Sequence, residues 1–495
     1  MSRVLFIGVD AADRDLVARW ADAGHLPTFL RLREQGATMD VDVPPVFYVG
    51  AVWPSFYTGW SAARHGRYCF KQFTPGTYRA EPVGPDIIPA PSFWQKLDEA
   101  GRRTVVIDVP KARLAPLEHG VHVVDWGTHD PERAGFATSP KSLAAEIQAR
   151  YGEEPVGNCD RVVRTAAGYR QFVRNLGKRI DAKLAMTKHL MATQDWDALA
   201  VCFGESHCVG HQCWHLHDDG HERHRPAIAS QVGDPVFDIY RALDTAVAAL
   251  IEAAGADCRV FVLCSHGMGR HYDGGHLLKE ALLRINRALP FGRPRSEQRA
   301  AFANRGADPA AGVELLPDGL PRPAMVQSFV VPNNDAYAGI RINVVGRELY
   351  GRIRPGEEFE NYRAALMEQL RAVTIDEGGP PAFASVFPVE EAYATRAASD
   401  ALPDVLAQWS RAASYHALAS PAIGRIEGDY RGVRTGDHRA VGRLHIVGPG
   451  IRAASLPSVR TEDIAPTICG LLGVALEDVD GRPIDLAPAR AVAAE

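Results

Sequence analysis

The sequence has no long hydrophobic run and little cysteine, and each absence excludes a class of protein. No stretch of about 18 apolar residues occurs, so we expect no membrane-spanning helix. The 495 residues include only 8 cysteines, and the start, MSRVLFIGVD, lacks the long apolar region and cleavage site of a signal peptide. We therefore expect a cytoplasmic protein with reduced thiols. Cys208 and Cys213 lack the C-x-x-C spacing of a zinc knuckle and are interpreted as free thiols.

The chain also lacks an excess of charge of either sign. Its 55 Lys and Arg residues and 60 Asp and Glu residues give a formal net charge of -5, without a long run of like charge. This balance argues against binding to nucleic acid, which usually needs a basic surface. We expect a small-molecule substrate instead. The oligomeric state is open, with a homodimer as one alternative.

Short β-rich runs alternate with helical patterns along the chain. Strands are expected at 3–9, 104–109, 198–203, 259–264 and 443–447, and helical apolar spacing covers about 13–35, 169–194, 237–254 and 461–472. This alternation predicts an α/β fold with a mostly parallel sheet flanked by helices.

The regularity of the pattern changes along the chain, which suggests a domain organisation. Residues 1–269, with a helical insertion at about 130–195, and residues 421–495 are interpreted as two parts of one core. Residues 270–420 are less regular and richer in proline and glycine. We expect them to be insertions that form a cap over one edge of the sheet.

Polar residues follow three of the expected strands, where ligands bind in parallel sheets. These are Asp10, the segment 205–211, and Ser265 with His266. His207 and His211 are four residues apart, so on a helix both rings leave one face and can grip one divalent metal. On their own, two histidines at this spacing are as often surface or helix-capping residues as metal ligands. The joint placement at strand ends favours a metal site.

Other histidines are weaker candidates for the same site. His215 extends the helical face of His211, and His438 stands just before the last expected strand. His271 and His276, in the segment GRHYDGGHL, either contact substrate, replace a lost ligand, or lie in a loop packed beside the site.

Several motifs occur in a specific order over nearly the whole chain. They are Gly8-Val9-Asp10, Trp53-Pro54-Ser55-Phe56-Tyr57-Thr58-Gly59 with His65-Gly66, Phe203-Gly204-Glu205 leading to His211 and Trp214, His266-Gly267-Met268, Pro332-Asn333-Asn334-Asp335, Gly436-Asp437-His438 and Asp463-Ile464-Ala465-Pro466-Thr467. This set resembles the alkaline phosphatase superfamily, in particular its type I phosphodiesterase/nucleotide pyrophosphatase branch. The resemblance implies an alkaline phosphatase-like fold, two divalent metals, usually zinc, and a Thr or Ser nucleophile. It also implies that Asp10, His211, His266 and His438 are metal ligands.

The sequence departs from the family pattern at three positions. His207 and Ser265 stand where the family has metal-binding aspartates, and Val49 stands at the nucleophile position, ten residues before Gly59. A valine cannot attack phosphorus, so the catalytic group is unknown. The adjacent hydroxyl of Tyr48 is a weak candidate.

These changes predict one strong metal site and one weak one. The first becomes His207, His211 and His438, three imidazoles that suit zinc, copper or iron better than magnesium. The other keeps Asp10 and His266 beside a serine, a poor ligand for a divalent ion. We therefore expect one transition metal in a three-histidine centre, most readily zinc, with iron, copper or manganese as alternatives.

Three functions remain open at this point. The first is a metal-dependent hydrolase of a phosphoester-type or related bond, in which metal-bound water replaces the missing nucleophile. The second is a non-hydrolytic metalloenzyme, a lyase or oxidoreductase of a specialised biosynthetic pathway. The third, a catalytically inactive binding protein, is disfavoured because decay would be expected to erode the imidazoles too.

Overall fold

The computed structural model describes residues 3–129, 135–291, 322–334, 336–393 and 402–486. The chain divides into two compact units. The first comprises Met1–His65, Gly84–His271 and Val433–Glu495, and the second comprises Gly66–Val83 and Tyr272–Gly432. Within the described part of the chain, no helix combines the length and apolar character needed to cross a membrane.

The first unit is built on a 10-stranded sheet with a parallel centre. Strand β1 (Arg3–Val9) lies between β8 (Ala198–Phe203) and β9 (Cys258–Cys264) and runs parallel to both. Strand β5 (Thr104–Ile107) continues the parallel set beyond β8, and β19 (Val441–Val447) pairs antiparallel with β9. The strand order is β20 (Ala454–Ser455), β2 (Ala37–Asp42), β19, β9, β1, β8, β5, β6 (Val121–Val124) and β7 (Ala137–Ser139), with β21 (Val459–Arg460) on β2. The predicted α/β class with a mostly parallel sheet is confirmed.

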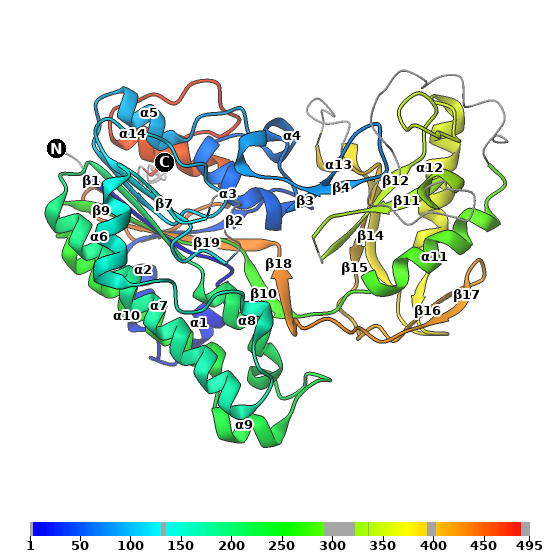
Figure 1. Ribbon diagram of the computed structural model, residues 1–495, viewed down its shortest axis with the longest axis horizontal. Coiled ribbons are helices and arrows are strands. Elements are labelled where there is room, and N and C mark those ends of the chain that lie inside the picture. Colours follow the sequence, from blue (N-terminus) through cyan, green and yellow to red (C-terminus); the bar gives the residue numbers. More distant parts are fainter. Residues whose placement is uncertain (1–2, 130–134, 292–321, 335, 394–401, 487–495) are drawn as a thin grey trace, which may run out of the picture. The chain divides into compact units, whose positions relative to one another are not determined.

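Both faces of this sheet are covered by helices, as the runs of buried residues in the central strands require. Figure 1 shows α7 (Ala166–Thr193) and α10 (Pro235–Ala254) on one face and α3 (Tyr48–Thr58), α5 (Phe93–Glu99) and α14 (Ile464–Leu471) on the other. Side chains of β1 alternate between the two layers: Ile7 joins the core beneath α7 and α10, and Phe6 stacks on Phe56 of α3 with ring centroids 4.2 Å apart.

The expected strands lie within two residues of their predicted bounds, and the structure adds local detail in three places. Residues 13–35 form two helices, α1 (Arg14–Asp22) and α2 (Pro27–Gln35), because the chain turns at Gly24 with a φ of 79° and restarts at a proline. The last helix begins with a 3-10 turn, Thr461–Asp463. His438 stands just before β19, as predicted, and itself lies in a short strand, β18 (Gly436–Arg439).

The second unit has its own sheet and core. Its antiparallel sheet has the order β11 (Ser328–Val331), β12 (Tyr337–Ile342), β15 (Val405–Trp409), β14 (Phe383–Pro388). Side chains of helices α11 (Gly275–Ala288) and α12 (Glu357–Arg371) join this sheet in one apolar core. The expected irregular stretch therefore contains regular structure. That it covers the edge of the first sheet stays a prediction.

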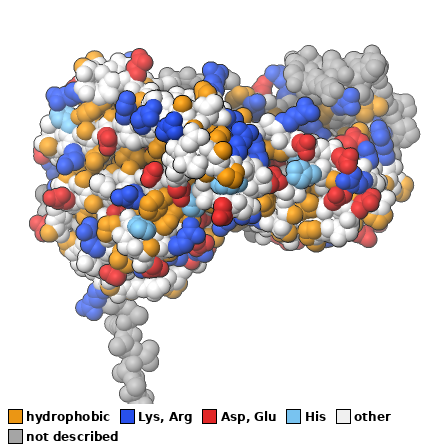
Figure 2. Space-filling view, turned by 90° about the horizontal axis from the view of Figure 1, so that it is seen from below, with side chains coloured by type: hydrophobic (Ala, Val, Ile, Leu, Met, Phe, Trp, Pro, Cys, Tyr) orange, Lys and Arg blue, Asp and Glu red, His pale blue; other side chains and the backbone are white. Residues whose placement is uncertain are grey.

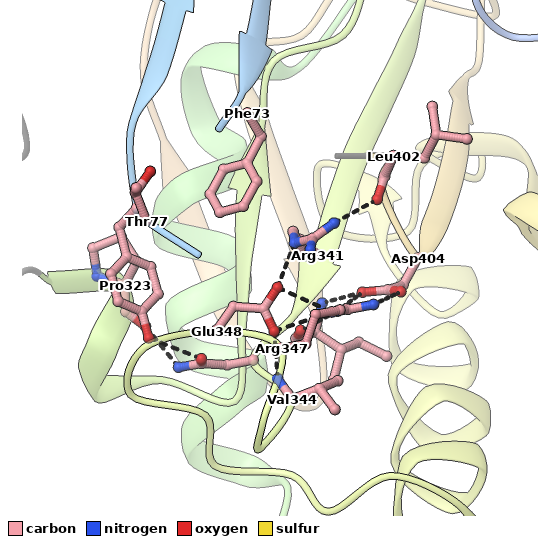
Figure 3. Close-up of polar contacts among 12 residues, drawn as sticks. Phe73, Thr77, Pro323, Arg341, Val344, Arg347, Glu348, Leu402 and Asp404 are labelled. Carbon is pink, nitrogen blue, oxygen red and sulfur yellow. Dashed lines mark hydrogen bonds and ion pairs between the residues drawn. The ribbon is translucent and has the colours of Figure 1, made fainter. Parts of the chain in front are cut away.

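A buried ion network lies inside the second unit (Figure 3). Arg341 donates to Glu348 at 2.5 Å, and Arg347 donates to Asp404 at 2.6 Å and to Glu348 at 3.0 Å. The Arg341 guanidinium also lies 4.7 Å from the ring centroid of Phe73. Two cations and two carboxylates therefore neutralise one another inside this unit.

The visible surface agrees with the near balance of charge in the sequence. Figure 2 shows Lys and Arg side chains interspersed with Asp and Glu, and apolar side chains scattered among them.

Candidate metal centre

Parallel pairing brings the candidate residues of the first unit to one edge of the sheet. Val9, the last residue of β1, is in register with Phe203 of β8 and Cys264 of β9. The residues after these strands therefore leave the sheet side by side. Directly after Asp10, Ala11 adopts a φ of 53°, a left-handed conformation that is costly for a residue with a side chain and is often found at functional sites.

Helix α8 (Glu205–His217) starts just after β8 and carries the first two histidines. Their spacing puts His207 and His211 on one face, as predicted, with the two Nε2 atoms 2.9 Å apart. Both rings are buried. The pair is thus turned toward the sheet edge rather than toward solvent.

His438 reaches the same place from a two-stranded ribbon. Strand β10 (Gly267–Arg270) pairs with β18, which sets His438 opposite Met268. A side chain at Gly436 would not fit, because a Cβ there would lie 2.2 Å from the carbonyl oxygen of Gly210 in α8. This close approach lets His211 Nδ1 donate to the Gly436 carbonyl at 2.8 Å and puts His438 Nε2 at 3.1 Å from His211 Nε2.

The carboxylate of Asp10 accepts hydrogen bonds from three side chains. Its Oδ2 accepts from His207 Nδ1 at 2.7 Å, and its Oδ1 accepts from Trp53 Nε1 and Ser265 Oγ, both at 2.9 Å. Burial acts to raise the pKa of Asp10, but attraction to His207 and their hydrogen bond outweigh it and leave the pKa below its ordinary value. The carboxylate is therefore ionised and acts as an acceptor.

Ser265 links Asp10 to the remaining imidazoles. Its hydroxyl proton goes to Asp10, so its oxygen accepts from His266 Nδ1 at 2.9 Å. His266 Nε2 in turn lies 3.1 Å from His438 Nδ1. This chain of partners assigns a proton to Nδ1 of both His266 and His438 and leaves the Nε2 lone pair of His438 facing His211.

The histidines of this cluster are neutral at pH 7. Desolvation lowers the pKa of His266 to about 4, against an opposing effect of Asp10. Desolvation also lowers the pKa of His207, and His129 adds to that shift. Burial also lowers the pKa values of His211 and His438 well below the usual range, followed for His211 by Arg434 and for His438 by the neighbouring histidines. Neutral imidazoles are the form that binds metals.

The other predicted residues have different surroundings. Both ring nitrogens of His215 contact hydroxyls, of Thr435 at 3.1 Å and of Tyr169 at 3.4 Å. His271 Nδ1 lies 4.0 Å from an oxygen of Asp437. His276 belongs to the second unit, where its Nε2 lies 3.0 Å from the Gly428 carbonyl oxygen.

The nucleophile position falls on the first turn of α3. The side chain of Val49 is half-buried. Tyr48 is the first residue of the helix, and its side chain lies outside the described part of the structure.

Sequence reasoning missed several neighbours of the cluster. His129 stacks on His207 with ring centroids 4.0 Å apart, and its Nδ1 lies 3.2 Å from Cys159 Sγ and 3.3 Å from Cys208 Sγ. Arg179, on the long helix α7, donates to Glu205 at 2.6 Å. No local spacing links these residues. All eight cysteines, every one within the described ranges, are free thiols, as expected for Cys208 and Cys213.

Two solved structures show which known folds the chain resembles. Phosphonoacetate hydrolase from Sinorhizobium meliloti 1021, in complex with phosphonoformate, has 15% sequence identity, 95% coverage of both chains and a TM-score of 0.54. An inactive variant of murine ectonucleotide pyrophosphatase/phosphodiesterase 5, in complex with AMP, has 14% identity, 97% coverage of both chains and a TM-score of 0.51. At these identities the similarity shows the fold alone.

The family is shown by a comparison of another kind. No curated protein matches the chain. The family model of type I phosphodiesterase/nucleotide pyrophosphatase, however, matches residues 4–417, well over half of the sequence. With its α/β fold, the chain belongs to the type I phosphodiesterase/nucleotide pyrophosphatase family and is placed among hydrolytic enzymes.

Proposed function

We propose that the protein is a metal-dependent hydrolase of a phosphoester-type or related bond, with its metal held by His207, His211 and His438. Family membership supports the hydrolytic reaction and the class of bond. The arrangement of the three imidazoles supports the single metal. Zinc is the metal we expect first, because the donor set is nitrogen only and the buried site favours a tetrahedral ion.

One observation carries the proposal: the Nε2 lone pair of His211 faces those of both His207 and His438 without a proton among them. His207 donates its Nδ1 proton to Asp10, His211 donates its own to the Gly436 carbonyl, and His438 is ordered through His266. Neutral imidazole has a single N–H. The Nε2 contacts of 2.9 Å and 3.1 Å therefore set lone pair against lone pair, which is favourable only with a cation between them.

The distances fit a metal of ordinary size. A zinc–nitrogen distance of 2.0–2.1 Å in tetrahedral geometry corresponds to nitrogens about 3.3 Å apart. The two observed separations are shorter by a few tenths of an ångström, so small rotations of the rings suffice to admit the ion.

Asp10, Ser265 and His266 act as positioning residues in this proposal rather than as ligands. Asp10 fixes the ring of His207, which is the usual role of a carboxylate behind a metal-binding histidine. Ser265 and His266 fix the ring of His438 in the same way, through a chain of hydrogen bonds that starts at Asp10. The aspartate of a second metal site has become a serine that hydrogen-bonds Asp10 and His266, which supports one metal instead of two.

The reaction follows from this arrangement and from the missing nucleophile. A divalent metal at three imidazoles supplies Lewis-acid chemistry, polarising the ester and making water acidic enough to attack. The chain's own part is to keep the imidazoles neutral and to fix their tautomers. No hydroxyl at position 49 competes with water for phosphorus.

The test combines metal content with hydrolysis of a generic aryl phosphodiester, bis(p-nitrophenyl) phosphate. We expect one equivalent of metal at the histidine centre, hydrolysis that chelation abolishes, and recovery with Zn²⁺ or Mn²⁺. His211→Ala should bind one equivalent of metal fewer than the wild-type protein and lose the hydrolysis. The matched control is His189→Ala, since His189 lies on the outer surface of α7 beside Glu146. Hydrolysis by metal-free protein, or full metal content in His211→Ala, would contradict the proposal.

The replacement of the nucleophile by Val49 favours one second candidate, a non-hydrolytic metalloenzyme with the same three-histidine centre. It predicts one equivalent of iron or copper and no turnover of any phosphodiester. The same metal analysis distinguishes the two functions.

A further inference from the structure

A second group of metal-binding side chains lies beside the histidine centre. His129, Cys159 and Cys208, which we call the thiol–imidazole cluster, have their potential ligand atoms within 4.8 Å of one another. His129 Nδ1 lies 3.2 Å from Cys159 Sγ and 3.3 Å from Cys208 Sγ. Both sulfurs are buried. The family resemblance assigns none of these residues a role.

The cluster is assembled from three separate segments that other contacts hold in place. Cys208 lies in the first turns of α8, and His129 lies in the segment after β6 (Val121–Val124). Cys159 begins the 3-10 turn η2 (Cys159–Arg161). The next residue, Asp160, accepts from Gln212 of α8 at 2.7 Å and from Arg434 at 3.3 Å. Cys159 is thus fixed against α8 without a disulfide between the thiols.

Charge around the sulfurs suits thiolate ligands. Arg179 Nη2 donates to Cys208 Sγ at 3.2 Å, and the same guanidinium is paired with Glu205 and Glu154. Arg179 is fully buried, so its attraction for a sulfur anion is weakly screened. Burying a thiolate is otherwise costly.

We propose that the thiol–imidazole cluster is a second metal site, which binds a thiophilic divalent ion such as Zn²⁺ through His129 Nδ1, Cys159 Sγ and Cys208 Sγ. Zinc–sulfur and zinc–nitrogen distances of 2.3 and 2.0–2.1 Å correspond to sulfur–nitrogen separations of about 3.6 Å in a tetrahedral site. The observed separations are within a few tenths of an ångström of this value. Two thiolates and one imidazole form the donor set that selects zinc over magnesium or calcium.

The two metal sites are mechanically joined through the stacked rings of His129 and His207, whose planes lie 27° apart. Cys208 also directly follows His207 in α8. A metal on the thiol–imidazole cluster would therefore fix the ring of His207 from its other side. The site is structural in this view, and it stands whether or not the histidine centre performs hydrolysis.

The test uses Co²⁺ as the probe on reduced, metal-stripped, full-length protein. Cobalt bound by thiolate gives an intense near-ultraviolet charge-transfer absorption that a histidine-only site does not give. We expect this band in the wild-type protein and its loss in Cys159→Ser and in Cys208→Ser. It should persist in Cys213→Ser, a buried thiol of the same helix, and in His211→Ala, which removes the histidine centre. Cys159 lies in a short 3-10 turn outside α8. The variant Cys159→Ser therefore keeps the test valid if Cys208→Ser fails to fold.

Three outcomes would overturn the proposal. They are the absence of a charge-transfer band in the reduced wild-type protein, a band that survives Cys159→Ser, and a mass two hydrogens lower that reveals a Cys159–Cys208 disulfide in the purified chain. Absence of hydrolysis in wild-type protein that shows the band would instead overturn the proposed function alone.

Discussion

The two units each bury a polar cluster, and the clusters differ in whether opposite charges balance within the cluster. In the second unit, Arg341 and Arg347 face Glu348 and Asp404, so each ion pair joins a guanidinium to a carboxylate (Figure 3). In the first unit, neutral imidazoles present lone pairs to one another. A completed network indicates a structural role, whereas a buried cluster that lacks one positive partner indicates a site for a cation.

The largest expected effect comes from removing one carboxylate of the buried ion network in the second unit. Glu348→Gln leaves the buried guanidinium of Arg341 without its carboxylate, and removing one partner of a buried pair costs about 3–5 kcal/mol of unfolding free energy. Guanidinium denaturation measures this loss. Metal content should not change. A loss well below 1 kcal/mol, or a loss of metal, would remove the contrast between the clusters.

A smaller effect is expected when the carboxylate behind the histidine centre is altered. Asp10→Asn weakens the hydrogen bond that fixes His207, and changes of this kind typically lower metal affinity about 10–100-fold. Competition with a chelator measures the affinity. The control is Asp40→Asn, a partly exposed partner of Arg443. Complete loss of metal, equal to that of His211→Ala, would show that Asp10 is a ligand.

A third effect, spread over a wide pH range, concerns a buried histidine outside both clusters. Desolvation lowers the pKa of His122 to about 4, although a hydrogen bond from the Ala115 amide acts against it. The unfolded chain binds this proton near pH 6.5, so stability is full above that pH. It then falls by about 1.4 kcal/mol per pH unit as the pH drops from 6.5 to 4.

Denaturation of metal-free protein across this range tests the sign of that dependence. His122→Gln should make the decline shallower, and His189→Gln, at the surface of α7, should leave it unchanged. An unchanged slope in His122→Gln would contradict the assignment of a neutral buried ring.

Local pattern predicted the parts of the fold and site that depend on local spacing. The strand ends at Asp10 and Ser265 were predictable because a buried parallel strand is a short apolar run, and the helical spacing of His207 and His211 fixed their common face. Which ring nitrogen of each histidine carries the proton was not predictable, because it depends on the close approach of Gly436 to α8. The thiol–imidazole cluster was missed for the same reason: its members come from a loop, a 3-10 turn and a helix that only the tertiary structure brings together.

The most direct test of the central claim is an anomalous-scattering map from crystals grown with zinc, recorded at the zinc absorption edge. The account predicts a peak about 2.1 Å from Nε2 of each of His207, His211 and His438, with Asp10 bonded to His207 and not to the ion. Two peaks in the first unit's histidine cluster, or a single ion bound by Asp10 and His266, would contradict it.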